Sequence, residues 1–557
     1  MRYLKLLSLR DRFTDRRQKV VPPRGIRADT NMSNTKTIAR NTGWYGIENI
    51  INFVVALSTS IAIARTLGPS KMGYIVYVSW ISGVVSMLGG MGIPQTTRKY
   101  MAEFLGKGDQ GTARYIYIRT MLLQIVLATV ATAGILTWVL SDASAEYRLA
   151  AVLLVLSIWP AMVNFVSAQA NAATEKLSRN MPASLVASLV FLIGIAATVV
   201  LKWGVVGVGA ATLAMRAADF LVRLFPTMKR VLAWDKVHVQ PPGLPKRMMT
   251  FAWQSVASML VSLIVWNRSE VFLLKHFCSD IRQIAFYSVA FSMAEQLLIS
   301  ATVFGSATGT TIFAQFGRDK SKLPAIAASS FRYLALTSIP LHFIASALAV
   351  PALRFLYGPK YEGAALVVTL APLLCLPKAF IGPVQSLMES MERQKFVILA
   401  TTLAGIIDIS VAWYLIRYLN AANGAVGACI GSGAAQVTAV GLMWAIGIHL
   451  FKVKLPWLQV MKVAFISVLA ALTAHYIAMH LAPLWGILLG GIASQIVLFG
   501  LFSLLRVLEP QDHVRLRTLI GMLPTTMAVS ANAALLLLAG GENASSAPAN
   551  DWDSEDR

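Results

Sequence analysis

The chain has 557 residues, of which 56% are apolar and only 13% are charged, and it carries a formal net charge of +23. Ordinary globular domains contain about a quarter charged residues, so this composition excludes a set of soluble domains and indicates a membrane protein. The basic residues stand between long apolar runs, where they orient a membrane protein, so we expect no nucleic-acid partner. Cys278, Cys375 and Cys429 are isolated, which excludes a disulfide framework and a CxxC metal site, and we expect no metal and no cofactor.

The first forty residues carry eleven Lys or Arg and no apolar core long enough for a signal peptide. This pattern predicts a basic cytoplasmic tail over residues 1–43. Met32-Ser33-Asn34 also has the character of a natural start, so residues 1–31 are either part of this tail or an upstream extension.

Apolar runs long enough to cross a bilayer, about 20 residues each, occur fourteen times and predict an all-α polytopic membrane protein. The first six cover 45–64, 73–92, 117–140, 149–171, 182–201 and 204–225. The next six cover 249–273, 284–305, 331–353, 363–388, 397–417 and 424–449, and two more cover 461–481 and 484–505. The predicted parts are an N-lobe (44–225), a cytoplasmic linker (226–248), a C-lobe (249–450), a final pair of helices (451–505) and a cytoplasmic segment (506–557). Within that last segment, Thr518 to Gly541 is read as an interfacial helix before a disordered tail, with a fifteenth span as the alternative.

Landmarks of the first lobe return in the second. Met101-Ala102-Glu103-Phe104 corresponds to Phe313-Ala314-Gln315-Phe316 at a shift of 212 positions, and Glu175 and Arg179 correspond to Glu389 and Arg393 at a shift of 214. This order indicates a duplicated half-protein. Because each half has an even number of spans, the two halves are predicted to be parallel repeats related by an axis along the membrane normal.

The distribution of Lys and Arg predicts the orientation. Connections after even-numbered spans, together with the N-terminal tail, carry 29 of these residues, and connections after odd-numbered spans carry 8. Cytoplasmic segments carry the excess, so both termini are predicted to lie in the cytoplasm. The outward connections are about ten residues or shorter, which leaves no room for a catalytic ectodomain, and no GxxxxGK[ST] phosphate loop is present. We therefore expect a transporter driven by an ion gradient, the membrane potential or the substrate gradient, and not an enzyme.

A family resemblance rests on Ala64-Arg65-Thr66-Leu67-Gly68-Pro69, then Gly73-Tyr74, then an Ala-Glu loop ending Gly106-Lys107-Gly108-Asp109. This stretch resembles the polysaccharide (O-antigen type) lipid flippases of the multidrug/oligosaccharidyl-lipid/polysaccharide (MOP) superfamily, over roughly residues 40 to 525. Arg268-Ser269-Glu270, followed by Tyr287-Ser288-Val289-Ala290, is similar to the family's seventh helix, where an Asp is commoner than Glu270.

The resemblance implies a bundle of two six-helix lobes around a central cavity that opens alternately to either side, with two added helices that guide a lipid tail. The implied substrate is a polyprenyl-diphosphate-linked oligosaccharide in the bacterial cytoplasmic (inner) membrane. A polysaccharide polymerase and a chain-length regulator are expected partners, beside membrane lipids. A sugar diphosphate cannot cross about 30 Å of hydrocarbon unaided, so such a protein has to shelter the headgroup.

Ionisable residues inside spans are costly and mark functional sites by default. Arg suits a diphosphate because its guanidinium forms a bidentate fork. We therefore predict a headgroup site from the basic residues Arg216, Arg268 and Lys378, and ion-coupling roles for the acidic residues Glu48, Asp219, Glu270, Glu295 and Asp408. The alternative is structural: Arg216 and Asp219 neutralise each other along one helix, and the buried carboxylates are hydrogen-bonded packing groups.

Prolines predict breaks or kinks in three spans, because each removes a helical hydrogen bond. The positions are Pro160, Pro340, Pro372, Pro377 and Pro383. The tenth span is a candidate gate with Lys378 at its break, and a static kink is the alternative. A cation-coupled multidrug antiporter of the MATE type is the second functional hypothesis, since it shares the two-lobed plan but usually has twelve helices.

Overall fold

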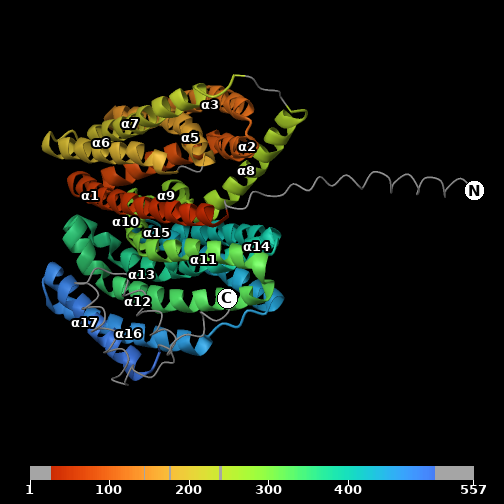
Figure 1. Ribbon diagram of the computed structural model, residues 1–557. Coiled ribbons are helices and arrows are strands. Elements are labelled where there is room, and N and C mark those ends of the chain that lie inside the picture. The colour runs from red at the N-terminus through yellow and green to blue at the C-terminus, as the bar shows by residue number, and fades with distance from the viewer. Residues whose placement is uncertain (1–26, 143–144, 175–176, 237–240, 508–557) are drawn as a thin grey trace, which may run out of the picture.

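The computed structural model describes residues 27–142, 145–174, 177–236 and 241–507, and these ranges fold into helices that run roughly side by side (Figure 1). The first seven α-helices are α1 (Arg27–Gly89), α2 (Ile93–Gly106), α3 (Gln110–Asp142), α4 (Ala145–Leu156), α5 (Ile158–Ala173), α6 (Met181–Val200) and α7 (Gly204–Leu232). The next seven are α8 (Leu244–Trp266), α9 (Glu270–Phe277), α10 (Arg282–Leu297), α11 (Ile299–Arg318), α12 (Leu323–Tyr357), α13 (Ala365–Cys375) and α14 (Ile381–Ser390). The last three are α15 (Gln394–Phe451), α16 (Trp457–His480) and α17 (Pro483–Leu504).

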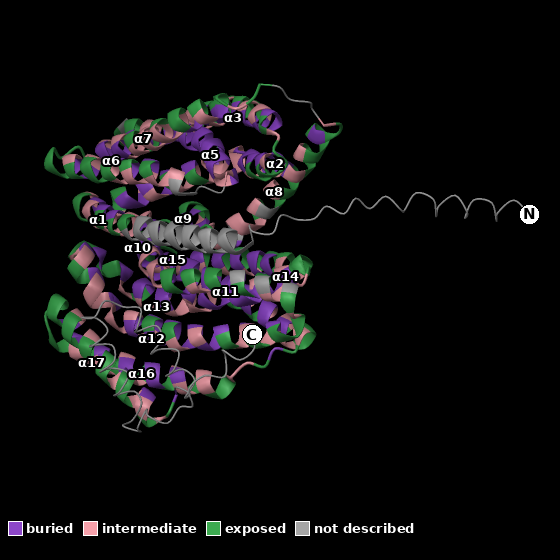
Figure 2. Cartoon of the chain, in the orientation of Figure 1, coloured by how far each residue is buried: buried purple, intermediate pink, exposed green. Residues whose placement is uncertain are grey.

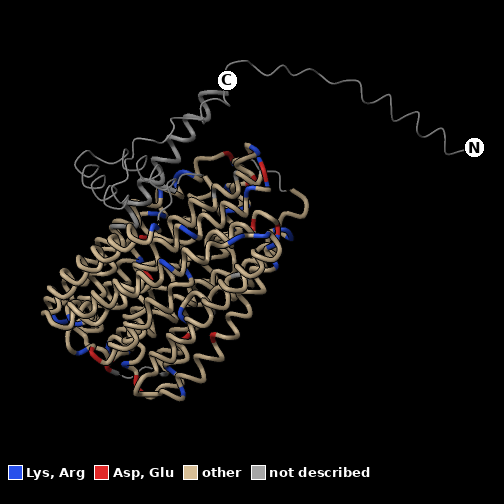
Figure 3. Tube along the Cα trace, turned by 90° about the horizontal axis from the view of Figure 1, so that it is seen from below, with Lys and Arg blue, Asp and Glu red and all other residues tan. Residues whose placement is uncertain are grey.

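The chain is a multi-pass membrane protein by the length and composition of these helices. Within the described ranges, ten helices are long and apolar enough to cross a membrane, or up to eleven when the bent pair α10 and α11 is taken as one span. Figure 3 shows Lys, Arg, Asp and Glu gathered mainly toward the two ends of the bundle, with few in between. The all-α polytopic prediction is confirmed. Residues 1–26 of the predicted tail 1–43 and the segment 508–557, including Thr518 to Gly541, lie outside the described residues.

Two long helices each contain two of the predicted apolar runs. α1 is interrupted at Gly68, whose φ of 73° is in the left-handed region, directly before Pro69. α15 is interrupted at Asn420 and Asn423. Glycine tolerates a positive φ, and the ring of a proline disfavours α-helical backbone angles at the residue before it. The Gly68-Pro69 pair is therefore the physical cause of the first interruption.

Buried residues form a core that continues from helices of the predicted N-lobe into helices of the predicted C-lobe. Its members include Tyr117 and Met162 from α3 and α5, and Tyr287 and Val367 from α10 and α13. A second core joins α12 to α16 and α17, which lie at the opposite edge of the bundle from α3, α6 and α7 (Figure 1). Figure 2 shows exposed residues along α6 and α17 and buried residues on α5, α13 and α15, as expected for an apolar bundle with lipid-facing outer helices.

α1 contacts several helices of the predicted C-lobe. The Oη atom of Tyr361 donates to the Ala64 carbonyl at 3.3 Å, and Arg65 donates from Nε to the Leu356 carbonyl at 2.7 Å and from Nη2 to the Phe355 carbonyl. Farther along α1, Gly73 lies so close to α10 that a Cβ there would be 2.3 Å from the Ile281 carbonyl oxygen. Only the absence of a side chain allows this approach.

Two of the three spans that contain the predicted prolines change their helical pattern near a proline. The fourth span divides at Ser157, three residues before Pro160, and the tenth divides into α13, a 3-10 segment (Leu376–Phe380) that contains Pro377, and α14. α12 continues from Leu323 to Tyr357 through Pro340, so the ninth span is not broken there, and a kink at Pro340 stays a prediction. α12 packs against α13, α16 and α17, and neighbouring helices of this kind hold a proline-containing helix together.

Candidate functional site: a charged cavity between the lobes

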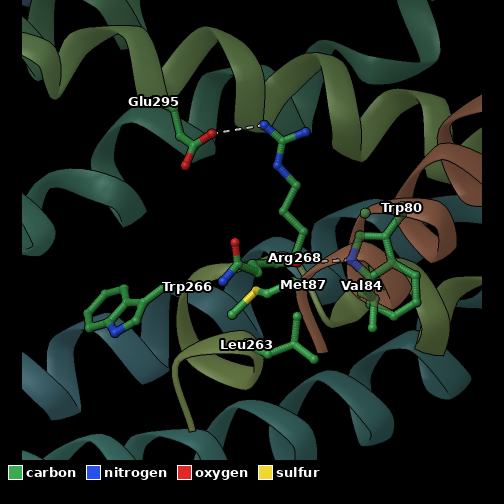
Figure 4. A pocket seen from close by; sticks show the side chains of 9 residues that line it. Trp80, Val84, Met87, Leu263, Trp266, Arg268 and Glu295 are labelled. Carbon is green, nitrogen blue, oxygen red and sulfur yellow. Dashed lines mark hydrogen bonds and ion pairs between the residues drawn. The ribbon is translucent and has the colours of Figure 1, made fainter. Parts of the chain in front are cut away.

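A cavity of about 290 Å³ lies between α1 on one side and α8 and α10 on the other (Figure 4). Its walls therefore come from both predicted lobes. The lining residues are Trp80, Gly83, Val84, Met87, Leu263, Trp266, Asn267, Arg268 and Glu295. Apolar and aromatic side chains with a few polar groups are the usual lining of a ligand site.

Arg268 occupies a break in the seventh predicted span. α8 ends at Trp266 and α9 begins at Glu270, and Arg268 between them has a φ of 58°, which is uncommon for a residue other than glycine. Its Nη2 atom donates to Glu295 Oε2 at 2.9 Å and to Ser292 Oγ at 3.3 Å. The guanidinium also lies 4.5 Å from the centroid of the Phe291 ring, an arrangement that favours a cation.

Lys378 approaches the same carboxylate from the break in the tenth span. Its Nζ atom lies 3.5 Å from Glu295 Oε1 and 5.4 Å from the Trp266 ring. One carboxylate therefore pairs with two cations, and the three groups carry a net charge of +1. Their side chains are 24% to 34% exposed, so all three can be reached by a polar ligand. Figure 4 shows Glu295 and Arg268 facing each other beyond the apolar side chains of Met87 and Leu263.

The two tryptophans of the cavity were not predicted from the sequence. Trp80 donates from Nε1 to the Asn267 carbonyl at 2.9 Å and so joins α1 to the break beside Arg268. Trp266 contributes its ring beside Lys378. A Trp is ordinary inside an apolar run, whereas an Arg or Lys there is rare. For that reason the sequence indicated only the cations as site residues.

A second polar cluster follows the break, and its members are not among the residues that line the cavity. Glu270 is 2% exposed and Asp408 is fully buried, and Ser269 Oγ donates to Asp408 Oδ2 at 3.4 Å. Tyr287 and Ser432 lie beside Glu270 together with Asp408. Two carboxyl groups that are buried side by side repel each other when both are ionised, so this pair suits the uptake of a proton or a cation. No group of three or more His, Cys, Asp or Glu that could hold a metal ion occurs among the residues the structure describes.

The predicted acidic and basic residues of the N-lobe form a separate cluster. Asp219 accepts from Arg223 at 2.5 Å and from Asn164 Nδ2 at 2.6 Å. The side chain of Arg223 is 10% exposed. Arg216 is exposed and does not line the cavity. Asp219 forms its ion pair with Arg223 and not with Arg216. The side chain of Glu48 lies outside the described part of α1.

Of the predicted residues, the structure thus brings together Arg268, Glu295 and Lys378 at one site and Glu270 and Asp408 at another. It does not bring Arg216 to Arg268 in the cavity. Glu295, for which an ion-coupling role was predicted, is paired with two cations.

Three solved structures with a similar fold are transporters. "Lipid II flippase MurJ, inward closed conformation" matches with a TM-score of 0.66 at 13% identity, over 83% of this chain and 98% of that one. An inward-facing multidrug resistance MATE family transporter of the MOP superfamily matches with a TM-score of 0.60 at 15% identity, over 72% and 96% of the two chains. A MOP superfamily transporter from Pyrococcus furiosus matches with a TM-score of 0.53 at 16% identity, over 74% and 96%. At these identities the likeness shows the fold alone.

Sequence comparison gives the family. No curated protein matches the chain. The model of a family described as "Polysaccharide biosynthesis protein" matches residues 38–316, which are half of the chain and include Trp80, Arg268 and Glu295 of the cavity. The chain belongs to this polysaccharide biosynthesis protein family and has the fold of the MOP superfamily transporters.

Proposed function

We propose that the protein moves a polyprenyl-diphosphate-linked oligosaccharide, the repeat unit of a surface polysaccharide, across the bacterial cytoplasmic membrane by alternating access. The observation that carries the proposal is the pair of cations, Arg268 and Lys378, beside an interlobe cavity in a polysaccharide biosynthesis family member. The fold likeness to a lipid II flippase supports the same class of substrate.

In this proposal the diphosphate binds at Arg268 and Lys378. Arg268 uses one terminal nitrogen for its two hydrogen bonds, so its remaining N–H groups are available to a phosphate within the described part of the site. Lys378 adds a second positive charge that is less directional. The polyprenyl tail stays in the lipid, and α16 and α17 against α12 are our candidates for its guide. Burial of the headgroup alone removes the cost of crossing the hydrocarbon.

The proposed membrane arrangement has fourteen spans, in two parallel lobes of six and a final pair, with both termini in the cytoplasm. The internal breaks of α1 and α15 support two crossings for each of these helices. The lobe contacts around Arg65, Gly73 and Tyr361 then lie at the outer end, so the described state is closed toward the outside.

The same proposal assigns coupling to the buried acidic pair. Glu270 and Asp408 take up a proton or a monovalent cation, and this uptake changes the packing of α9 against α15. Glu48 and Asp219 remain predicted coupling residues. A polysaccharide polymerase and a chain-length regulator are the proposed partners, because a flipped repeat unit needs both to become a polymer.

The second candidate, a cation-coupled multidrug antiporter, is favoured by the buried Glu270–Asp408 pair and by the fold likeness to MATE transporters. The two functions differ in what the cavity prefers. A cationic drug needs a net negative cavity, whereas Arg268, Lys378 and Glu295 together are net positive.

The experiment is complementation of surface polysaccharide in a strain that lacks the gene, with membrane protein quantified by immunoblot. Arg268→Ala and Lys378→Ala should abolish polysaccharide at normal protein level, and Arg268→Lys should restore part of it because the charge is kept and the bidentate fork is lost. Arg354→Ala is the matched control, since Arg354 is an exposed cation paired with Glu362 away from the cavity. Normal polysaccharide from both cavity variants would exclude the proposed headgroup site, and drug resistance conferred by the wild type would support the antiporter.

A further inference from the structure

We propose that Glu295 is a resident counter-ion that holds Arg268 and Lys378 while the cavity is empty, and that the substrate diphosphate displaces it on binding. This inference rests on the proposed function. It assigns to Glu295 a role different from ion coupling: the carboxylate sets the affinity of the site for the phosphate and promotes its release.

The geometry of Glu295 is that of an internal substitute for a bridging phosphate. Its Oε2 atom accepts from Arg268 at 2.9 Å and its Oε1 atom lies 3.5 Å from Lys378 Nζ. The two oxygens of one anion thus engage two cations that come from separate broken spans, α8–α9 and α13–α14. A diphosphate presents the same kind of oxygen atoms and carries more negative charge, so it binds the same pair of cations more strongly.

The pairing is also weak enough to be displaced. Arg268 contacts Glu295 through a single nitrogen and not through the bidentate fork, and the Lys378 contact at 3.5 Å is long. All three side chains are a quarter to a third exposed, so water screens their attraction. Glu295 itself lines the cavity and stands where an entering ligand meets the cations.

A counter-ion at this position has a clear physical purpose. Two uncompensated cations inside an apolar bundle are costly, and one carboxylate lowers that cost while leaving a net charge of +1 to attract an anion. After transport, the same carboxylate competes with the phosphate for both cations. Without this competition the site would bind its ligand more tightly and release it more slowly.

The alternative is that Glu295 is only a structural link, which joins α10 to the two broken spans. The two roles predict opposite changes in binding. Removing a structural link loosens the site and weakens phosphate binding, whereas removing a competitor strengthens it.

The test measures binding of inorganic diphosphate to the purified full-length protein in detergent by isothermal titration calorimetry. Glu295→Gln should bind diphosphate about fivefold more tightly than the wild type, as expected from the loss of one partly exposed ion pair. Glu295→Asp, which keeps the charge but withdraws it by one methylene, should lie between the two. Glu362→Gln is the control, because Glu362 pairs with Arg354 away from the cavity and should leave binding unchanged. If Glu295→Gln does not accumulate, the Asp variant alone decides, and it should still bind more tightly than the wild type.

Unchanged or weaker binding by the Glu295 variants would overturn the inference. The proposed function is tested separately by the double variant Arg268→Ala/Lys378→Ala. If that variant loses binding while Glu295→Gln does not gain it, the headgroup site stands and the counter-ion role falls; if the double variant binds as the wild type does, the proposed function falls. In cells, Glu295→Gln should lower surface polysaccharide in spite of tighter binding, because release is slowed, and a normal or raised level would count against the inference.

Discussion

Replacement of Gly73 by alanine should force the two lobes apart at the end where α1 meets α10. A Cβ at position 73 would lie 2.3 Å from the Ile281 carbonyl oxygen and 3.2 Å from its carbon, whereas ordinary contact begins near 3.4 Å. The obstacle is backbone and cannot rotate away, so α1 and α10 have to separate by about 1 Å, which is the difference between 3.4 Å and 2.3 Å.

Overpacking of this kind costs typically about 1–3 kcal/mol. The clash exists only while the lobes are in contact, so the whole cost is a difference between two states and changes their ratio by roughly 5- to 150-fold. We therefore expect Gly73→Ala to populate a state that is open at this end, and to reduce polysaccharide export at normal protein level.

The assay is a distance measurement between spin labels at Lys71→Cys and Arg282→Cys, two exposed positions that flank the contact on opposite lobes. The three native cysteines are replaced by alanine in the same background. Gly134→Ala is the matched control, because Gly134 is also helical and has no neighbouring atom within 4 Å of a built Cβ. Identical distance distributions for Gly73→Ala and the parent would refute the reasoning.

Three further predictions concern orientation, the N-lobe cluster and the α2–α8 contact. A single cysteine at Lys360 should react with a membrane-impermeant reagent in intact cells and one at Lys320 should not, and the reverse pattern would overturn the topology. Arg223→Ala should lower the thermal midpoint more than Arg216→Ala, because it leaves Asp219 with Asn164 alone, and adding Asp219→Asn should restore part of the loss; equal effects of the two single variants would contradict this. At the end of α2, the hydrogen bond from Lys107, with the nearby Arg247 charge, holds the pKa of Glu103 below its usual value. The stability that the ionised Glu103 contributes is therefore present above its unfolded-state pKa and is lost as the pH falls through its folded-state pKa. Glu103→Gln should therefore lower the thermal midpoint at neutral pH, with the difference shrinking in acid, and a difference that does not depend on pH would argue against it.

The sequence was sufficient for the fold class and for most helix positions, because apolar runs of bilayer length are a strong local signal. Lys378 was expected at a proline-dependent break, and in the structure it lies with Pro377 in the 3-10 segment from Leu376 to Phe380. The break at Asn267 to Ser269 was not predicted, since no proline or glycine marks it and Arg268 adopts a positive φ. Tertiary packing, including the Trp80 hydrogen bond to the Asn267 carbonyl, holds it instead.

The candidate site was predicted as a set of residue types but not as a set of partners. Burying a charge inside a span is costly, which singled out Arg268, Glu295, Lys378, Glu270 and Asp408. Which cation meets which carboxylate depends on how α8, α10 and α13 lie against one another, and spacing along the chain contains no such information. For that reason Arg216 was grouped with Arg268, although it lies outside the cavity lining.

The position of Arg268 has a mechanical consequence. The beginning of α8 is tied to α2 by the Arg247–Glu103 ion pair and by the close approach of Ala252 to Gly92, whereas α9 beyond the break packs on α15. In the proposed alternating-access mechanism, a movement of the predicted lobes relative to each other changes the angle between α8 and α9, and that angle is set at Arg268. The proposed ligand contact and the proposed hinge are then the same residue. A ligand that fixes the position of the Arg268 guanidinium would also favour one angle between α8 and α9, and by reciprocity each angle would have its own affinity for that ligand.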